Sequence, residues 1–199
     1  MDPVQKHMDD LAIADPEAAK RMRGHLSGSA SPEVVRHLDR VVAEVIEALS
    51  VEISYGRTLA DGMGRMMANG TLVNLEKFRR QVKAAAARGP TLGGLFARHL
   101  VPVLTCEDIG LACRFEEATR IMLQKGTYTL KAPLEALSKL IEKKDMACAH
   151  AFLDLLATTY ALDISYNRTV YLTHALPRAV DGFVTTRRLW QIKGLTRII

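Results

Sequence analysis

Apolar residues recur at three- and four-residue steps along most of this chain. From Pro32 the pattern runs through Leu38, Val42, Val45 and Leu49, and this spacing places the side chains on one face of an α-helix. The same spacing returns over residues 72–82, 92–100, 109–122, 133–176 and 184–192. No stretch alternates apolar and polar residues between turn signals, as a half-buried strand would. The sequence therefore predicts an all-α protein.

Prolines, glycines and capping residues predict where these helices begin and end. Asp15-Pro16-Glu17 and Ser31-Pro32-Glu33 each place a capping side chain before a proline, which suits the first position of a helix. The helix that begins at Pro32 can run as far as Met67, unless Gly56, Gly62 or Gly64 bends or breaks it. Pro102 is expected to end the helix over 92–100, and a polar joint at 142–145 is expected to divide the longest apolar region.

A six-residue segment occurs twice. Residues 53–58, Ile-Ser-Tyr-Gly-Arg-Thr, return 111 positions later as residues 164–169, Ile-Ser-Tyr-Asn-Arg-Thr, with five of six positions identical. Gly70, Gly126 and Gly182 are also spaced by 56 and 56 residues. Such periods are typical of stacked helical repeats, because one helical pair cannot bury its own apolar face.

We therefore predict a single all-helical domain over residues 1–199, either a right-handed, α-solenoid-like stack of about three degenerate repeats or a compact helical bundle. The expected parts are a cap at 1–30 and units at about 31–89, 90–131 and 132–199.

The repeated segment permits two interpretations. In the first, Ile53 and Ile164 are core residues, while the tyrosine and arginine satisfy loop carbonyls or pair with an acid of a neighbouring unit. In the second, four side chains line a surface that holds a carboxylate or phosphate of a partner, since a guanidinium suits such groups. These candidates are Tyr55, Arg57, Tyr166 and Arg168.

Charge adds a second set of candidates. The chain has 27 basic and 22 acidic residues, a net charge of +5. Six basic residues against one acidic residue lie in 76–98, and five against one lie in 178–197. They are consistent with a solvated face, an acidic protein partner or a nucleic-acid backbone. The candidates for a basic stripe are Arg79, Arg80, Lys83, Arg187 and Arg188.

No motif in the chain indicates a reaction, a cofactor or a metal. The glycine-rich phosphate loops and the nucleophile elbow are absent. His99, Cys106 and Cys113 are seven residues apart, about 10 Å on a helix, too far to share one metal. Both cysteines are therefore expected to be buried and inert.

The apolar segments and the two ends of the sequence give further expectations. No uncharged apolar window approaches 18 residues, and the N-terminal residues lack the pattern of a secretory signal. We expect no membrane span and a cytoplasmic location. The final residues, Ile198-Ile199, suggest stacking on a second copy of the chain.

Three segments within residues 151–194 carry a resemblance to a known family. They are Ala-Phe-Leu-Asp-Leu-Leu at 151–156, Ala-Leu-Pro-Arg-Ala-Val at 175–180 and Leu-Trp-Gln-Ile-Lys-Gly at 189–194. These segments resemble the helical repeats that precede the von Willebrand A domain in accessory proteins of MoxR-type AAA+ ATPases. The metal-binding Asp-x-Ser-x-Ser of that domain is absent here. The resemblance implies a helical adaptor in a larger assembly and assigns no functional residue.

The sequence predicts a non-enzymatic helical-repeat scaffold or adaptor that binds a protein partner, which its basic patches suggest is acidic. The first alternative is a basic helical-repeat protein that binds nucleic acid. The second is a helical bundle with a small molecule or cofactor between its helices.

Overall fold

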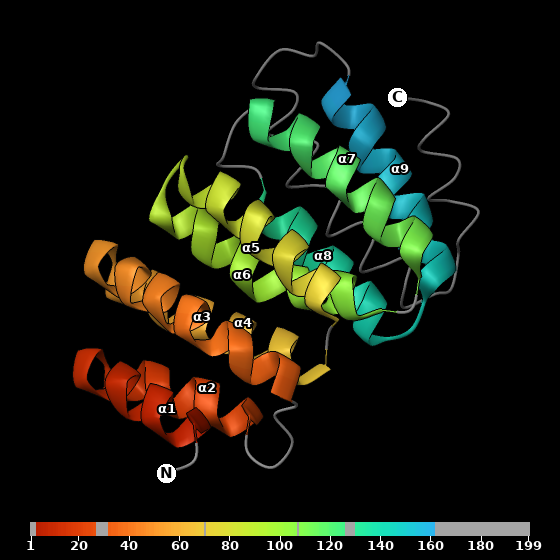
Figure 1. Cartoon of the computed structure of the whole chain (residues 1–199). Helices are drawn as coiled ribbons and strands as arrows, with labels where there is room; N and C mark the ends of the chain where they lie inside the picture. Colours follow the sequence, from red (N-terminus) through yellow and green to blue (C-terminus); the bar gives the residue numbers. More distant parts are fainter. Residues whose placement is uncertain (1–2, 27–31, 70, 107, 126–129, 162–199) are drawn as a thin grey trace. The chain divides into compact units, whose positions relative to one another are not determined.

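The structure, a computed structural model, describes residues 3–26, 32–69, 71–106, 108–125 and 130–161 of the 199-residue chain. Over these ranges the protein is all-α, as predicted (Figure 1). The helices are α1 (Pro3–Ala14), α2 (Pro16–Leu26), α3 (Pro32–Val51), α4 (Ile53–Asn69), α5 (Leu72–Ala86), α6 (Pro90–Thr105), α7 (Ile109–Lys125), α8 (Lys131–Glu142) and α9 (Met146–Ala161).

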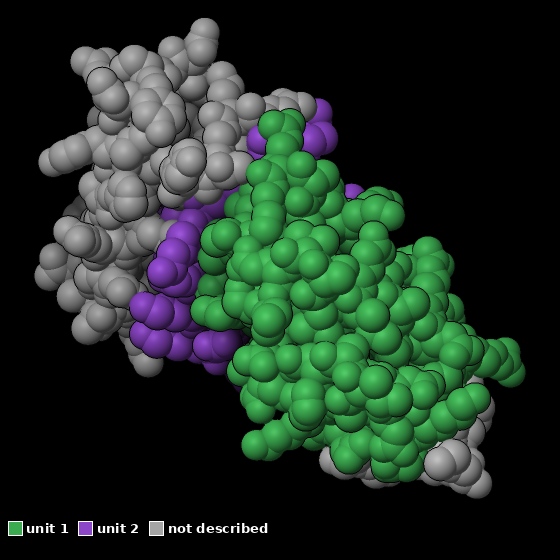
Figure 2. All heavy atoms as spheres, turned by 90° about the vertical axis from the view of Figure 1, so that its left-hand side faces the viewer, with its two compact units in different colours: residues 1–105 green, residues 106–199 purple. Residues whose placement is uncertain are grey.

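The chain divides into two compact units, residues 1–105 and residues 106–199 (Figure 2). Unit 1 contains α1 to α6, and the described part of unit 2 contains α7 to α9. The boundary falls inside the range 90–131 that the sequence suggested for a second repeat. The repeated segment at 164–169 and the last predicted helix lie outside the described residues.

Helix α4 is the centre of unit 1, where it packs against α2, α3, α5 and α6. A glycine allows the close approach of α4 and α6, because a Cβ at Gly62 would lie 2.6 Å from the Ala97 carbonyl oxygen and 2.7 Å from Phe78 Cζ. Met63 and Met66 are also fully buried here, as expected for methionines that fill a core. The neighbours of α4 therefore share one apolar core.

The helix predicted from Pro32 to Met67 is interrupted at Glu52, where α3 ends and α4 begins. The chain folds back at this point, and a Cβ at Gly56 would lie 2.5 Å from Leu49 Cγ. The expectation that Ile53 is a core residue is wrong, since it is 58% exposed. The turn at Glu52 makes Ile53 the first residue of a new helix and removes it from the apolar stripe of α3.

The sequence Arg88-Gly89-Pro90 predicts the end of the helix over 72–82, and the connection between α5 and α6 confirms it, whereas the end of α6 corrects the boundary expected at Pro102. Gly89 has φ +148°, a conformation that favours glycine, and α6 starts at Pro90. The helix then continues through Pro102 to Thr105, although Pro102 was expected to end it. Val103 and Leu104 are buried beyond the proline, so their packing holds the last turn despite the lost backbone hydrogen bond.

In unit 2, α9 packs against both α7 and α8. The fully buried rings of Phe115 in α7 and Phe152 in α9 belong to its core. The predicted polar joint is confirmed, because α8 ends at Glu142 and Lys144 adopts φ 58° before α9 starts.

Candidate binding groove

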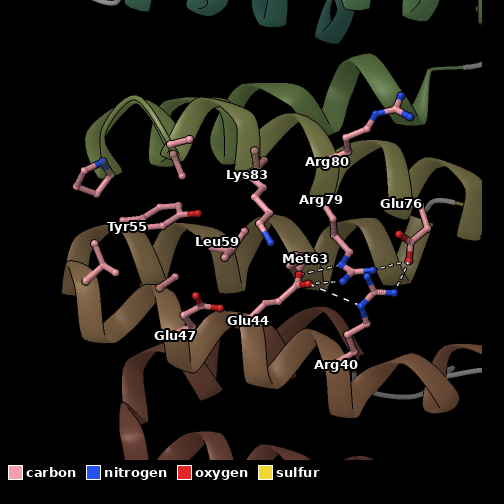
Figure 3. Close-up of a pocket in the computed structure, with 16 residues that line it drawn as sticks. Arg40, Glu44, Glu47, Tyr55, Leu59, Met63, Glu76, Arg79, Arg80 and Lys83 are labelled. Atoms are coloured by element: carbon pink, nitrogen blue, oxygen red, sulfur yellow. Dashed lines mark hydrogen bonds and ion pairs between the residues drawn. The ribbon is translucent and has the colours of Figure 1, made fainter.

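A groove of about 530 Å³ lies in unit 1 between α3 and α5, with α4 as its floor (Figure 3). Each of these helices presents one face to it. The lining residues are Arg40, Glu44, Glu47, Ala48 and Val51 of α3, Tyr55, Leu59 and Met63 of α4, Glu76, Arg79, Arg80, Val82, Lys83 and Ala86 of α5, and Ala87 and Pro90 after it.

An ion-pair network joins α3 to α5 in one half of the groove (Figure 3). Arg79 donates from Nε to Glu44 Oε2 at 2.8 Å and also donates to Glu76. Arg40 Nη1 lies 3.6 Å from Glu76 Oε1 and its Nε lies 3.8 Å from Glu44 Oε1. Hydrogen bonding to Glu44 raises the pKa of Arg79. Two guanidinium groups and two carboxylates therefore balance one another here.

Tyr55 forms part of the floor in the other half of the groove. Its ring packs on α6 at a glycine, because a Cβ at Gly93 would lie 2.9 Å from Tyr55 Cε2 and 2.7 Å from Ala86 Cβ. Burial raises the pKa of the Tyr55 hydroxyl, and the carboxylates of Glu44 and Glu47 add to the effect. The hydroxyl is thus a protonated donor at neutral pH, and it has no hydrogen-bond partner among the described residues.

Two further charged side chains lie in the half of the groove that contains Tyr55. Lys83 extends from α5 into the groove, and Glu47 lies on the α3 side (Figure 3). Within the described ranges, the Lys83 ammonium forms no ion pair. Ala86 lies beside Tyr55 at Gly93, and Ala48, Val51, Ala87 and Pro90 add apolar surface to the groove.

Some of the predicted site residues come together in this groove and others do not. Tyr55, Arg79, Arg80 and Lys83 line it, although Arg79 is only 7% exposed and Arg80 is directed away from Lys83 (Figure 3). Arg57 does not line the groove and forms an ion pair with Asp15 instead. The candidates outside the described residues are Tyr166, Arg168, Arg187 and Arg188.

The sequence analysis did not identify the acidic residues of the groove. Arg40 and Glu44 are four residues apart, and Glu76 and Arg79 are three apart, a spacing that does indicate ion pairs on one helix. The pairing of Glu44 with Arg79 spans 35 residues and depends on the packing of α3 and α5 beside α4. No local signal predicts it.

The cysteines lie outside the groove, and the expectation that Cys106 and Cys113 are both buried is wrong. Cys113 is exposed and Cys106 is partly exposed, while Cys148 is buried. Burial raises the pKa of the Cys148 thiol to about 11. In the part of the chain that the structure describes, no three histidine, cysteine, aspartate or glutamate side chains are placed to hold a metal ion.

Comparisons with known proteins identify no relative of this chain. No protein-family model, no curated protein and no solved structure matches the chain. Among the described helices, none combines the length and apolar character needed to cross a bilayer.

Proposed function

We propose that this protein is a non-enzymatic binding module and that the groove of unit 1 holds a segment of a protein partner. The observation that carries the proposal is a groove with two different halves. One half is held by the Arg79 network, and the other offers apolar surface with two donors, on Lys83 and Tyr55, that have no partner in the described part of the chain. Its volume of about 530 Å³ is within the range of roughly 300–1,000 Å³ that ligand sites commonly have.

The charges of the groove favour a protein segment over a nucleic-acid backbone. A phosphate-binding surface needs several cations that are free to approach successive phosphates. Here Arg79 is buried among Glu44 and Glu76 and so contributes nothing to an exposed basic stripe. Glu47 adds a carboxylate to the wall, which repels a polyanion.

The arrangement of the helices supports the same conclusion. Because α3 and α5 flank α4, the groove follows the helices, and a partner helix or extended segment can lie along it, as in other helix-in-groove complexes. The adaptor role that the resemblance to the accessory proteins of MoxR-type ATPases implies is part of this proposal. So is a cytoplasmic location, on the sequence grounds given above.

The experiment selects peptides from a random display library on the full-length protein and compares two tryptophan variants. Val51→Trp fills the apolar half of the groove from a position that is 65% exposed, so the fold tolerates it. Ala43→Trp is the control, because Ala43 is exposed on the same helix and does not line the groove.

We expect selected peptides that bind Val51→Trp at least about tenfold more weakly than wild type and bind Ala43→Trp normally. Thermal melts monitored by circular dichroism verify that both variants are folded. A selection that yields no peptide with this dependence would overturn the proposed function.

A further inference from the structure

We propose that the groove recognises a carboxylate next to an apolar side chain, supplied by neighbouring acidic and aliphatic residues of the bound segment. The carboxylate is held by Lys83 Nζ and Tyr55 Oη, and the aliphatic side chain covers the apolar surface beside them. This inference rests on the proposed function and names the chemistry of its ligand.

Two donors that line the groove have no acceptor among the described residues, the exposed ammonium of Lys83 and the hydroxyl of Tyr55. An ammonium group has three donors and no acceptor, and a buried tyrosine hydroxyl usually finds a partner. Neither Lys83 nor Tyr55 has one among the described side chains, although Tyr55 is only 9% exposed. A carboxylate has two oxygens and therefore accepts from both donors, and such charge-assisted bonds are stronger than neutral ones.

The surrounding charges restrict the ligand to a single carboxylate. The guanidinium groups of Arg40 and Arg79 are already balanced by Glu44 and Glu76. Arg80 also lines the groove but points away from Lys83 (Figure 3), so among the described residues Lys83 is the cation that a ligand meets beside Tyr55, with Glu47 on the opposite wall. A phosphate dianion gains one cation and is repelled by the nearby carboxylates. A carboxylate is attracted to the same cation, and because it carries half the charge of the dianion, the nearby carboxylates repel it less.

The apolar surface explains why the carboxylate needs an aliphatic neighbour. Val51 is 65% exposed although it lines the groove, and Ala86, Ala87 and Pro90 continue this surface on the side of α5 and α6. Covering these side chains removes apolar area from water and favours binding. Ala86 Cβ and Tyr55 Cε2 lie 2.7 Å and 2.9 Å from the same point, the Cβ position at Gly93, so neighbouring ligand residues reach both the apolar surface and the tyrosine.

The test uses the groove-dependent peptides of the selection described above. Each peptide is compared by fluorescence anisotropy with a copy in which its acidic residues are replaced by the corresponding amides. Three protein variants are measured with both peptides. Lys83→Met keeps the apolar stem and removes the charge, Tyr55→Phe removes only the hydroxyl, and Lys77→Met is the control, since Lys77 lies on α5 and does not line the groove.

We expect acidic residues beside aliphatic ones in the selected peptides. Lys83→Met should weaken binding about threefold to tenfold, and Tyr55→Phe about tenfold, while Lys77→Met leaves it unchanged. The amide peptides should bind wild type and Lys83→Met equally.

Groove-dependent peptides without acidic residues, or peptides that bind Lys83→Met as tightly as wild type, would overturn the inference and leave the proposed function standing. Because the absence of any groove-dependent peptide defeats the proposed function first, the two failures are distinguishable.

Discussion

Arg57 of α4 donates from Nη2 to Asp15 Oδ2 at 2.9 Å, and the same aspartate caps α2 by accepting from the Ala18 amide at 2.7 Å. One buried carboxylate therefore closes the first turn of α2 and joins this helix to the centre of unit 1. Unit 2 repeats the arrangement. Asp108 accepts from the Leu111 amide at the start of α7 and lies 2.7 Å from His150 Nε2 of α9.

Replacing the capping residue Asp15 should lower the free energy of unfolding more than replacing Arg57, which contacts it. Asp15→Ala removes both the cap and the ion pair, and we expect a loss of about 1–2 kcal/mol in the free energy of unfolding. Arg57→Gln leaves the cap, and Arg57 is partly exposed, so its loss should be smaller. Urea unfolding of both variants measures the difference, and a larger loss for Arg57→Gln would contradict this role of Asp15.

The two capping aspartates predict how stability depends on pH. Hydrogen bonding to Arg57 lowers the pKa of Asp15, and the contact with His150 lowers the pKa of Asp108, in both cases from 3.8. A carboxyl whose pKa is lower in the folded state stabilises the protein above its unfolded pKa and loses that contribution as the pH falls through the folded pKa. Wild-type stability should thus decline below about pH 4.

The measurement is urea unfolding of wild type and Asp108→Asn from about pH 6 to about pH 2.5. The advantage of wild type should be constant at the upper end and shrink towards the acidic end. A difference that does not change with pH would show that the Asp108 carboxylate contributes nothing through its charge.

The glycine pair at the start of α6 provides a matched test of the packing that holds Tyr55. Gly93→Ala places a methyl group 2.7 Å from Ala86 Cβ and 2.9 Å from Tyr55 Cε2, so α5 or Tyr55 must move. We expect a loss of about 1–3 kcal/mol and weaker peptide binding. At Gly94 the nearest atoms of Tyr55 are 3.8 Å away, and Gly94→Ala should be neutral or stabilising because alanine favours a helix. Equal effects of the two substitutions in thermal melts would contradict this packing.

Neighbouring arginines of α5 should differ sharply in their effect on stability. Arg79 is buried and bound to Glu44 and Glu76, so Arg79→Met leaves the two carboxylates with Arg40 alone, at 3.6–3.8 Å. We expect a loss of about 1–3 kcal/mol, less than for a fully buried pair because both glutamates remain partly in water. Arg80→Met changes an exposed position and should stay within about 0.5 kcal/mol of wild type. Chemical denaturation separates the two, and equal losses would contradict a structural role for the network.

Much of the helical fold is predictable from local pattern. The three- and four-residue spacing identifies the apolar faces of α3, α5 and α9, and the breaks at Gly89 and Lys144 coincide with residues of positive φ. The errors occur where tertiary packing overrides local preference. Examples are Pro102, which is held inside α6 by buried neighbours, and Ile53, which the turn at Glu52 leaves exposed.

The groove is less predictable than the helices. Tyr55 and Lys83 were both candidates, but for different reasons and on different predicted surfaces, because spacing along the chain does not tell which helices flank α4. Arg79 was a candidate for an exposed stripe and is buried by acids from α3 and α5. Local charge patterns show which side chains carry charge, whereas only the packing decides which charges are already balanced.

The central claim is that Lys83 holds a carboxylate of a partner segment in the groove of unit 1. A charge exchange tests it most directly, with wild type and Lys83→Glu each measured by fluorescence anisotropy against a groove-dependent peptide and its acid-to-lysine copy. We expect Lys83→Glu to bind the original peptide at least about tenfold more weakly and the lysine copy more tightly than wild type does. The claim would be contradicted if the affinity losses of the two changes simply added and the exchanged pair, Lys83→Glu with the lysine copy, recovered no affinity.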